Sequence, residues 1–125
     1  MKINLVCVED SIMAFPARKM ASFVKSIHAN TQLYFVPYMV NRTNLRVLLG
    51  NFGDINKEGF DPNDIRQMAE PLSQAEIVGF SSMTGYSDMT RALIKEIRYL
   101  NPNAFIIWGG IHPIIDPEDA IKSAD

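Results

Sequence analysis

Short apolar runs alternate along this chain with segments whose apolar residues recur every three or four positions. The runs Ile3–Val8, Thr31–Tyr38, Ile77–Phe80 and Phe105–Trp108 have the length and the β-branched or aromatic content of strands. Runs that are apolar almost throughout, as the first and the last two are, indicate buried strands of a parallel sheet. Pro37 cannot donate to a sheet, so the second run is expected at an edge or ends there.

Helical periodicity fills the first two intervals between these runs. Pro16 suits the first turn of a helix reaching about Asn30, with an apolar stripe at Met20, Phe23, Val24 and Ile27. The sequence from Asp61 to Asp64 combines a capping residue, a proline and an acid, which predicts the start of a second helix. That helix is expected to end at Pro71 and to face the sheet with Ile65, Met68, Ala69 and Leu72.

Two further helices are predicted in the second half of the chain. The first has its apolar face at Met89, Leu93, Ile97 and Leu100 and stops at Asn101 and Pro102. A second capped start, from Asp116 to Asp119, opens the other, which carries Ala120, Ile121 and Ala124. The stretch from Asn41 to Phe60 has no clear pattern, and we interpret it as an insertion.

This alternation of strands and helices predicts a doubly wound, open parallel α/β sheet. The expected arrangement is flavodoxin-like or Rossmann-like, in three layers, with the strand order 2-1-3-4, right-handed crossovers and a ligand crevice between the first and third strands. Residues 1–125 are interpreted as a single domain. Since the alternation asks for a fifth strand, we expect the chain to be a fragment of a longer protein.

Small and polar residues gather where the third and fourth strands are expected to end. Parallel strands end at one edge of a sheet, so Ser81, Ser82 and Met83 should lie beside the Gly109-Gly110 pair and His112. Hydroxyls and backbone amides there can hydrogen-bond a polar ligand. The paired glycines either let a large flat molecule approach the backbone or make a tight turn, and the sequence favours neither.

Composition removes several classes of function. With 12 basic and 14 acidic residues and a net charge of -2, no basic field points to nucleic acid. The single cysteine, Cys7, is expected to be a small buried hydrophobe and suits a reducing, cytoplasmic compartment. The sequence contains no CxxC or HExxH motif that would indicate a metal site. Its first apolar run is too short to span a membrane.

Four segments carry a resemblance to a known family. IVGFSSMTG, IKEIRYLNPN, FIIWGGIHP and DPEDAIKSAD resemble the cobalamin-binding domain that precedes the barrel of radical S-adenosylmethionine enzymes. The resemblance covers Ala75 to Asp125 well and the first half mainly through its order of strands and helices. It implies a cofactor site formed by three loops, with the residues Asp10, Ser11, Met13, Phe15, Ser81, Ser82, Met83, Thr84, Gly109, Gly110, His112 and Pro113.

The first loop departs from better-known cobalamin proteins, which place a cobalt-binding histidine there. Glu9 to Phe15 contain no histidine. The resemblance therefore implies cobalamin without a histidine ligand on its lower face, in a module that is inert alone. Its partner would be a radical S-adenosylmethionine domain of the same parent chain, of methyltransferase type, which would bind S-adenosylmethionine and a 4Fe–4S cluster outside this fragment.

Three other functions are compatible with the same strand order. A signalling receiver would use the acidic pair Glu9 and Asp10, but it needs an aspartate where this chain has Ser81 and Ser82. A flavin or nucleotide module would need phosphate donors in the first loop, where these acids would repel a phosphate. A degenerate cobalamin-type domain could serve only as an interaction domain.

Overall fold

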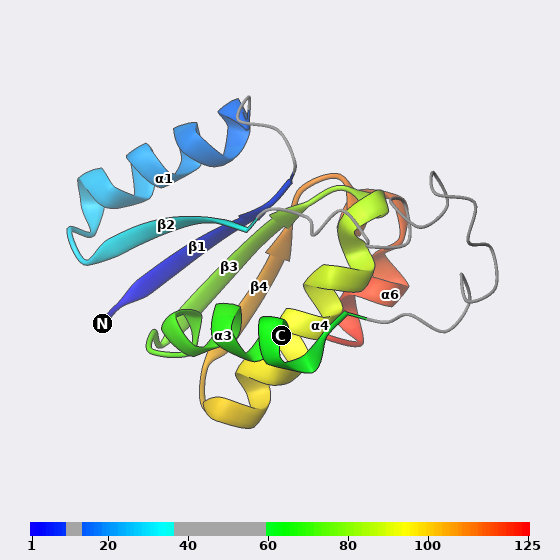
Figure 1. Cartoon of the computed structure of the whole chain (residues 1–125). Helices are drawn as coiled ribbons and strands as arrows, with labels where there is room; N and C mark the ends of the chain where they lie inside the picture. The colour runs from blue at the N-terminus through cyan, green and yellow to red at the C-terminus, as the bar shows by residue number, and fades with distance from the viewer. Residues whose placement is uncertain (10–13, 37–59) are drawn as a thin grey trace, which may run out of the picture.

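The sheet in this computed structural model has four parallel strands in the order β2-β1-β3-β4, which confirms the predicted topology (Figure 1). The strands are β1 (Ile3–Val8), β2 (Thr31–Val36), β3 (Ile77–Ser82) and β4 (Phe105–Gly109). The structure describes residues 1–9, 14–36 and 60–125. The insertion predicted between the second strand and the second helix lies outside the described residues, apart from Phe60.

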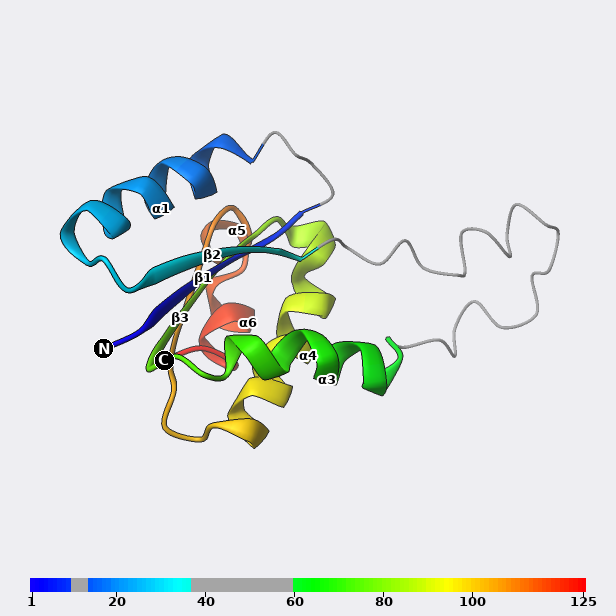
Figure 2. The same ribbon diagram turned by 60° about the vertical axis from the view of Figure 1, so that its left-hand side comes forward.

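Helices cover both faces of the sheet. They are α1 (Phe15–Ile27), α3 (Pro62–Leu72), η1 (Thr84–Tyr86), α4 (Ser87–Leu100), α5 (His112–Ile115) and α6 (Pro117–Ile121). Figure 2 shows α1 on one side of the sheet and α3, α4 and α6 on the other. No helix in the described ranges is long and apolar enough to cross a membrane.

Both predicted caps form. The carboxylate of Asp61 accepts from the backbone N–H of Asn63 at 2.8 Å, and that of Asp116 accepts from Asp119 N–H at 3.1 Å. The predicted end of α3 is wrong by one residue, because the helix continues past Pro71 to Leu72. The short helix α5 was not predicted, since a single turn has too few apolar positions to show a period.

The main core lies between the sheet and α3, α4 and α6. Leu93 and Ile97 of α4 are fully buried there against Val78 and Ile106 of the sheet. The predicted apolar faces of α3 and α4 are confirmed by this packing. Each such side chain contributes roughly 1.5–3 kcal/mol by leaving water, so this layer supplies much of the stability of the fold.

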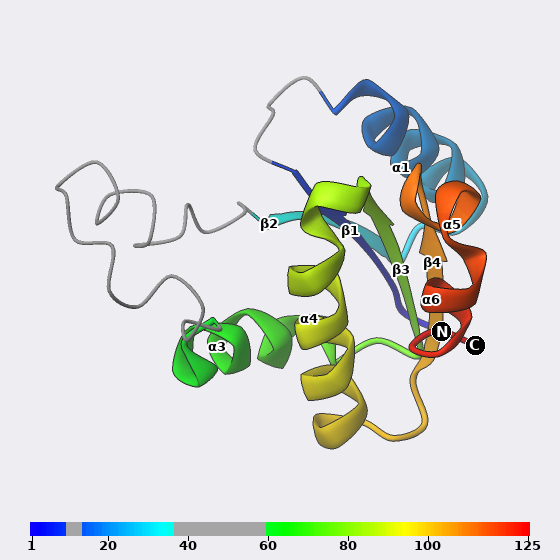
Figure 3. The same cartoon turned by 90° about the vertical axis from the view of Figure 1, so that its right-hand side faces the viewer.

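The opposite face is covered only in part, and here the prediction that the fourth run is a buried strand is wrong. Phe105 and Ile107 of β4 point to this face and are 52% and 50% exposed. In the described part of the chain α1 is the only helix on this side, and it lies over β1 and β2 (Figure 3). The stripe predicted on α1 is also largely exposed, at Met20, Phe23 and Ile27.

Candidate functional site

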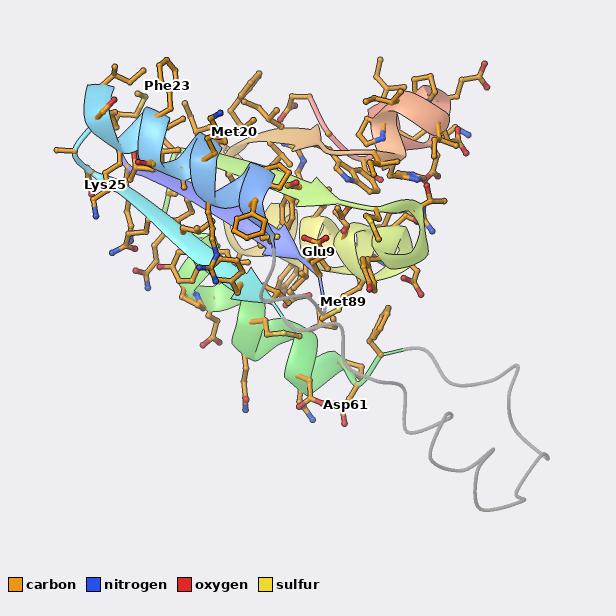
Figure 4. The ribbon with its side chains drawn as sticks, turned by 90° about the horizontal axis from the view of Figure 1, so that it is seen from above. Glu9, Met20, Phe23, Lys25, Asp61 and Met89 are labelled. Carbon is orange, nitrogen blue, oxygen red and sulfur yellow. The ribbon has the colours of Figure 1, made fainter. Side chains whose placement is uncertain are left out.

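The register of the sheet brings three predicted loops to one edge. Ser81 on β3 pairs with Cys7 of β1 on one side and with Gly109 of β4 on the other. The strands therefore end side by side, as the sequence predicts. Figure 4 shows Glu9 at the carboxyl end of β1. The predicted site residues Asp10, Ser11 and Met13 lie outside the described residues.

An apolar groove of about 330 Å³ runs along the α1 face of the sheet. It extends from Ile3 and Ile77, where the strands begin, to Ser81 and Gly109, where they end. Two predicted site residues thus line it. The other residues that line it are Leu5, Val6, Ala17, Met20, Val24, Leu33, Gly79, Phe80 and Ile107. A concave, mostly apolar site with a polar group at one end is typical of small-molecule binding.

Two glycines help to keep this groove open. A Cβ at Gly79 would lie 3.0 Å from Cδ2 of Leu5, and one at Gly109 would lie 3.6 Å from the backbone oxygen of Phe80. Both residues line the groove, so any side chain there would take up its volume. Gly79 was not among the site residues predicted from the sequence. The available signal was a glycine inside a strand, which often marks the close approach of a ligand or of another backbone.

Gly110 has a different role, because it makes the turn after β4. Its φ is +96°, and a Cβ there would lie 2.7 Å from the backbone oxygen of Ser82 and 2.8 Å from its nitrogen. Only glycine fits such a position without strain. The tight-turn explanation therefore holds for Gly110, while Gly109 contributes no side chain to the groove that it lines.

Ser82 and His112 are buried on the other face of the sheet. The Ser82 side chain accepts a hydrogen bond from Nε1 of Trp108 at 2.8 Å. His112 is 2% exposed, and its Nε2 lies 2.9 Å from the Asp119 carboxylate. Neither residue lines the groove. Ser81 and Ser82 separate because neighbouring strand residues point to opposite faces.

The remaining predicted site residues are spread along the same edge. Phe15, the first residue of α1, is 64% exposed, and Met83, after β3, is 40% exposed. Thr84 opens the 3₁₀ turn η1 and is exposed. Pro113 lies in α5 and is half-buried. These side chains border the edge of the sheet and are not part of the groove lining.

The pKa values of two side chains, Cys7 and Asp119, are shifted from their ordinary values in opposite directions. Burial raises the pKa of the Cys7 thiol to about 12, and the thiol donates to the Glu9 carboxylate at 3.4 Å. Cys7 is thus a buried hydrophobe, as predicted, and not a nucleophile. The hydrogen bond from His112, with Arg91 nearby, lowers the pKa of Asp119. Among the described residues no cluster of His, Cys, Asp or Glu could hold a metal ion.

Comparison with known proteins agrees with this geometry. The family model of the B12 binding domain matches residues 43–125, about two thirds of the chain. No curated protein and no solved structure matches it. The matched region includes β3, β4 and the turn at Gly110, and the parallel 2-1-3-4 sheet is the arrangement expected for such domains. Because this match covers more than half of the sequence, the chain belongs to the B12 binding domain family.

Proposed function

We propose that this chain binds cobalamin with the nucleotide tail in the apolar groove and the corrin ring over the carboxyl edge of the sheet. The groove between α1 and the strands is the observation that carries this proposal. Its volume, about 330 Å³, is at the small end of ligand pockets, so it would take the tail and leave the much larger ring outside.

The residues of the groove fit a flat aromatic base at the end of a polar linker. Gly79 and Gly109 leave room along β3 and β4, and Met20 and Val24 of α1 offer apolar contacts on the other side. Ser81, at the carboxyl end of the groove, could hydrogen-bond the linker. Phe15, exposed at the start of α1, is suited to contact the apolar surface of the ring.

We further propose that the cofactor is held base-off, without a histidine on its lower face. The chain has two histidines. Nε2 of His28, next to the last residue of α1, lies 2.7 Å from the backbone oxygen of Met1, at the amino end of the sheet. His112 is buried between Trp108 and Asp119. Cobalamin without this ligand supplies a cobalt that is more easily reduced to a nucleophilic state, which suits methyl transfer.

The parent protein, in this proposal, is a cytoplasmic radical S-adenosylmethionine enzyme of methyltransferase type. The resemblance of Ala75 to Asp125 to the cobalamin domains of such enzymes supports it. In that arrangement the present chain supplies binding and orientation, and a second domain of the same parent holds S-adenosylmethionine and a 4Fe–4S cluster. A reading frame that continues past Asp125 into a C-x₃-C-x₂-C motif would support this parentage, and a frame without it would count against it.

Titration with hydroxocobalamin tests the binding itself. The chain has one tryptophan, Trp108, next to the site, so its fluorescence and the cobalamin absorption both report binding. We expect saturable binding at micromolar protein. Absence of any spectral change would contradict the proposal and favour a degenerate domain that serves only for interaction.

Two matched variants locate the site. Met20 and Phe23 are both exposed on α1, at 60% and 65%, but only Met20 lines the groove (Figure 4). Met20→Glu places a carboxylate against an apolar ligand and should weaken binding at least about tenfold. Phe23→Glu makes the same change outside the groove and should stay within about twofold of the unmodified chain. Equal affinities would mean that the ligand lies elsewhere.

A further inference from the structure

A chain of contacts leads from α4 to the end of β3, half-buried at Arg91 and Asp119 and buried from His112 onward. It begins with Asp119 of α6, whose carboxylate oxygen is shared by the guanidinium of Arg91 and the ring of His112. A carboxylate with a lowered pKa can only accept, so Nε2–H of His112 donates this bond. Nδ1 of the same ring is buried and has no hydrogen-bond partner among the residues that the structure describes.

The next contacts cross from α5 to β3. The His112 ring packs against Trp108 of β4, with the ring centroids 4.9 Å apart and the planes tilted by 33°. Trp108 is 7% exposed and donates from Nε1 to the Ser82 hydroxyl at 2.8 Å. The ring of Trp108 is therefore held on one side by His112 and at its N–H by β3.

The last contacts reach the groove. The turn residue Gly110, two positions before His112, lies so close to Ser82 that a Cβ would be 2.7 Å from its backbone oxygen. The same Cβ would lie 3.3 Å from the hydroxyl of Ser81, which lines the groove together with Gly109. Any movement of α5 would thus move the turn that borders the groove.

We propose that His112 is a positioning residue for the cofactor site. It touches no ligand; its bond to Asp119 and its contact with Trp108 fix the Gly110 turn against Ser82, and so hold Ser81 and Gly109 in place. A side chain kept for packing alone would be apolar, because a buried ring nitrogen without a partner is destabilising. Compared with an apolar side chain at this position, histidine adds the hydrogen bond to Asp119. This inference rests on the proposed function.

The test compares two ion pairs of similar exposure that join α4 to the last part of the chain. Arg91 pairs with Asp119, which bonds to His112 after the carboxyl end of β4, whereas Arg98 pairs with Asp125, which bonds to Ile106 near the start of β4. We expect Asp119→Asn, which exchanges the charged acceptor for a neutral amide oxygen, and His112→Leu, which removes the donor, each to weaken hydroxocobalamin binding about tenfold. The matched control Asp125→Asn should bind within twofold of the unmodified chain.

Two more readouts separate positioning from general stability. His112→Gln, whose amide can donate to Asp119, should regain most of the affinity lost in His112→Leu. The emission of Trp108, measured without cofactor, should shift in Asp119→Asn but not in Asp125→Asn. If the unmodified chain binds and the Asp119 and His112 variants bind equally well, the positioning role is refuted and the proposed function stands. If the unmodified chain does not bind hydroxocobalamin, both the positioning role and the proposed function are refuted.

Discussion

Replacing Gly110 by alanine tests the central geometric feature of the edge, namely that the turn after β4 lies directly on Ser82. The new Cβ would lie 2.7 Å and 2.8 Å from backbone atoms of Ser82, which cannot move aside as a flexible side chain could. The φ of +96° adds strain for any residue with a side chain. Backbone strain of this kind costs about 1–3 kcal/mol, and the contact with β3 brings the total to roughly 2–4 kcal/mol.

This loss converts into a measurable change in melting temperature. An unfolding entropy of about 2.1 cal/mol/K per residue gives roughly 0.26 kcal/mol per degree for 125 residues. Gly110→Ala should therefore lower Tm by about 8–15 °C in a thermal melt followed by circular dichroism. Since Trp108 precedes the turn by two residues, its emission should change as well.

The neighbouring glycine provides the control. Gly109→Ala places its Cβ 3.6 Å from the backbone oxygen of Phe80, which is an ordinary van der Waals contact, and the φ at Gly109 is not positive. We expect its Tm to stay within about 2 °C of the unmodified chain. If Gly110→Ala and Gly109→Ala have the same Tm, the close contact between the Gly110 turn and Ser82 is refuted, because a Cβ at Gly110 would then fit without strain.

Three further predictions concern the core, the thiol and acid stability. Leu93→Ala, at a fully buried position, should lower the free energy of unfolding by about 2–5 kcal/mol in urea titration, while truncation of the exposed Ile121 should cost much less. Cys7, with its pKa raised to about 12, should resist a thiol reagent at pH 8 until the chain unfolds; rapid labelling of native protein would contradict its burial. The pKa of Asp119 is below its ordinary 3.8 in the folded state, so its contribution to stability is present above that value and is lost as the pH falls through the folded pKa. The Tm difference between the unmodified chain and Asp119→Asn should accordingly be constant near neutral pH and should decrease below about pH 4. A Tm difference that increases in acid would show that folding raises the pKa of Asp119 instead of lowering it.

The strands, the caps and the faces of α3 and α4 could be predicted because local signals determine them. Asp61 and Asp116 bond to amides two or three residues away, so their effect is contained in a short stretch of sequence. The parallel arrangement of the strands follows from the alternation of strands and helices. The exposure of Phe105 and Ile107 could not be predicted in this way, because an apolar run reads the same whether a helix covers one of its faces or both.

The candidate site, like the fold, was predicted from the sequence only in part. That Ser81 and Gly109 lie side by side follows from the parallel register, and the sequence anticipated it. Which of Ser81 and Ser82 faces the groove was not predicted, because the apolar run ends at Phe80 whereas the strand continues through both serines to Ser82. The partner of His112 was missed for another reason: Asp119 lies seven residues away on a separate helix, and the packing of α5 against α6 brings the two together.

The two faces of this sheet are specialised, and the specialisation explains how a domain of this size can both fold and keep a groove. Where α4 covers the strands, large side chains such as Ile97 and Ile106 fill the layer completely and supply stability. Where α1 covers them, Gly79 and Gly109 contribute no side chain, so the same strands leave an apolar space. Burial lost on the second face must be offset by the first, because net stabilities of domains are small. The contacts that run from Asp119 through Trp108 to Ser82 lie on the filled face. They connect to the groove through the backbone, because the neighbouring residue Ser81 lines it.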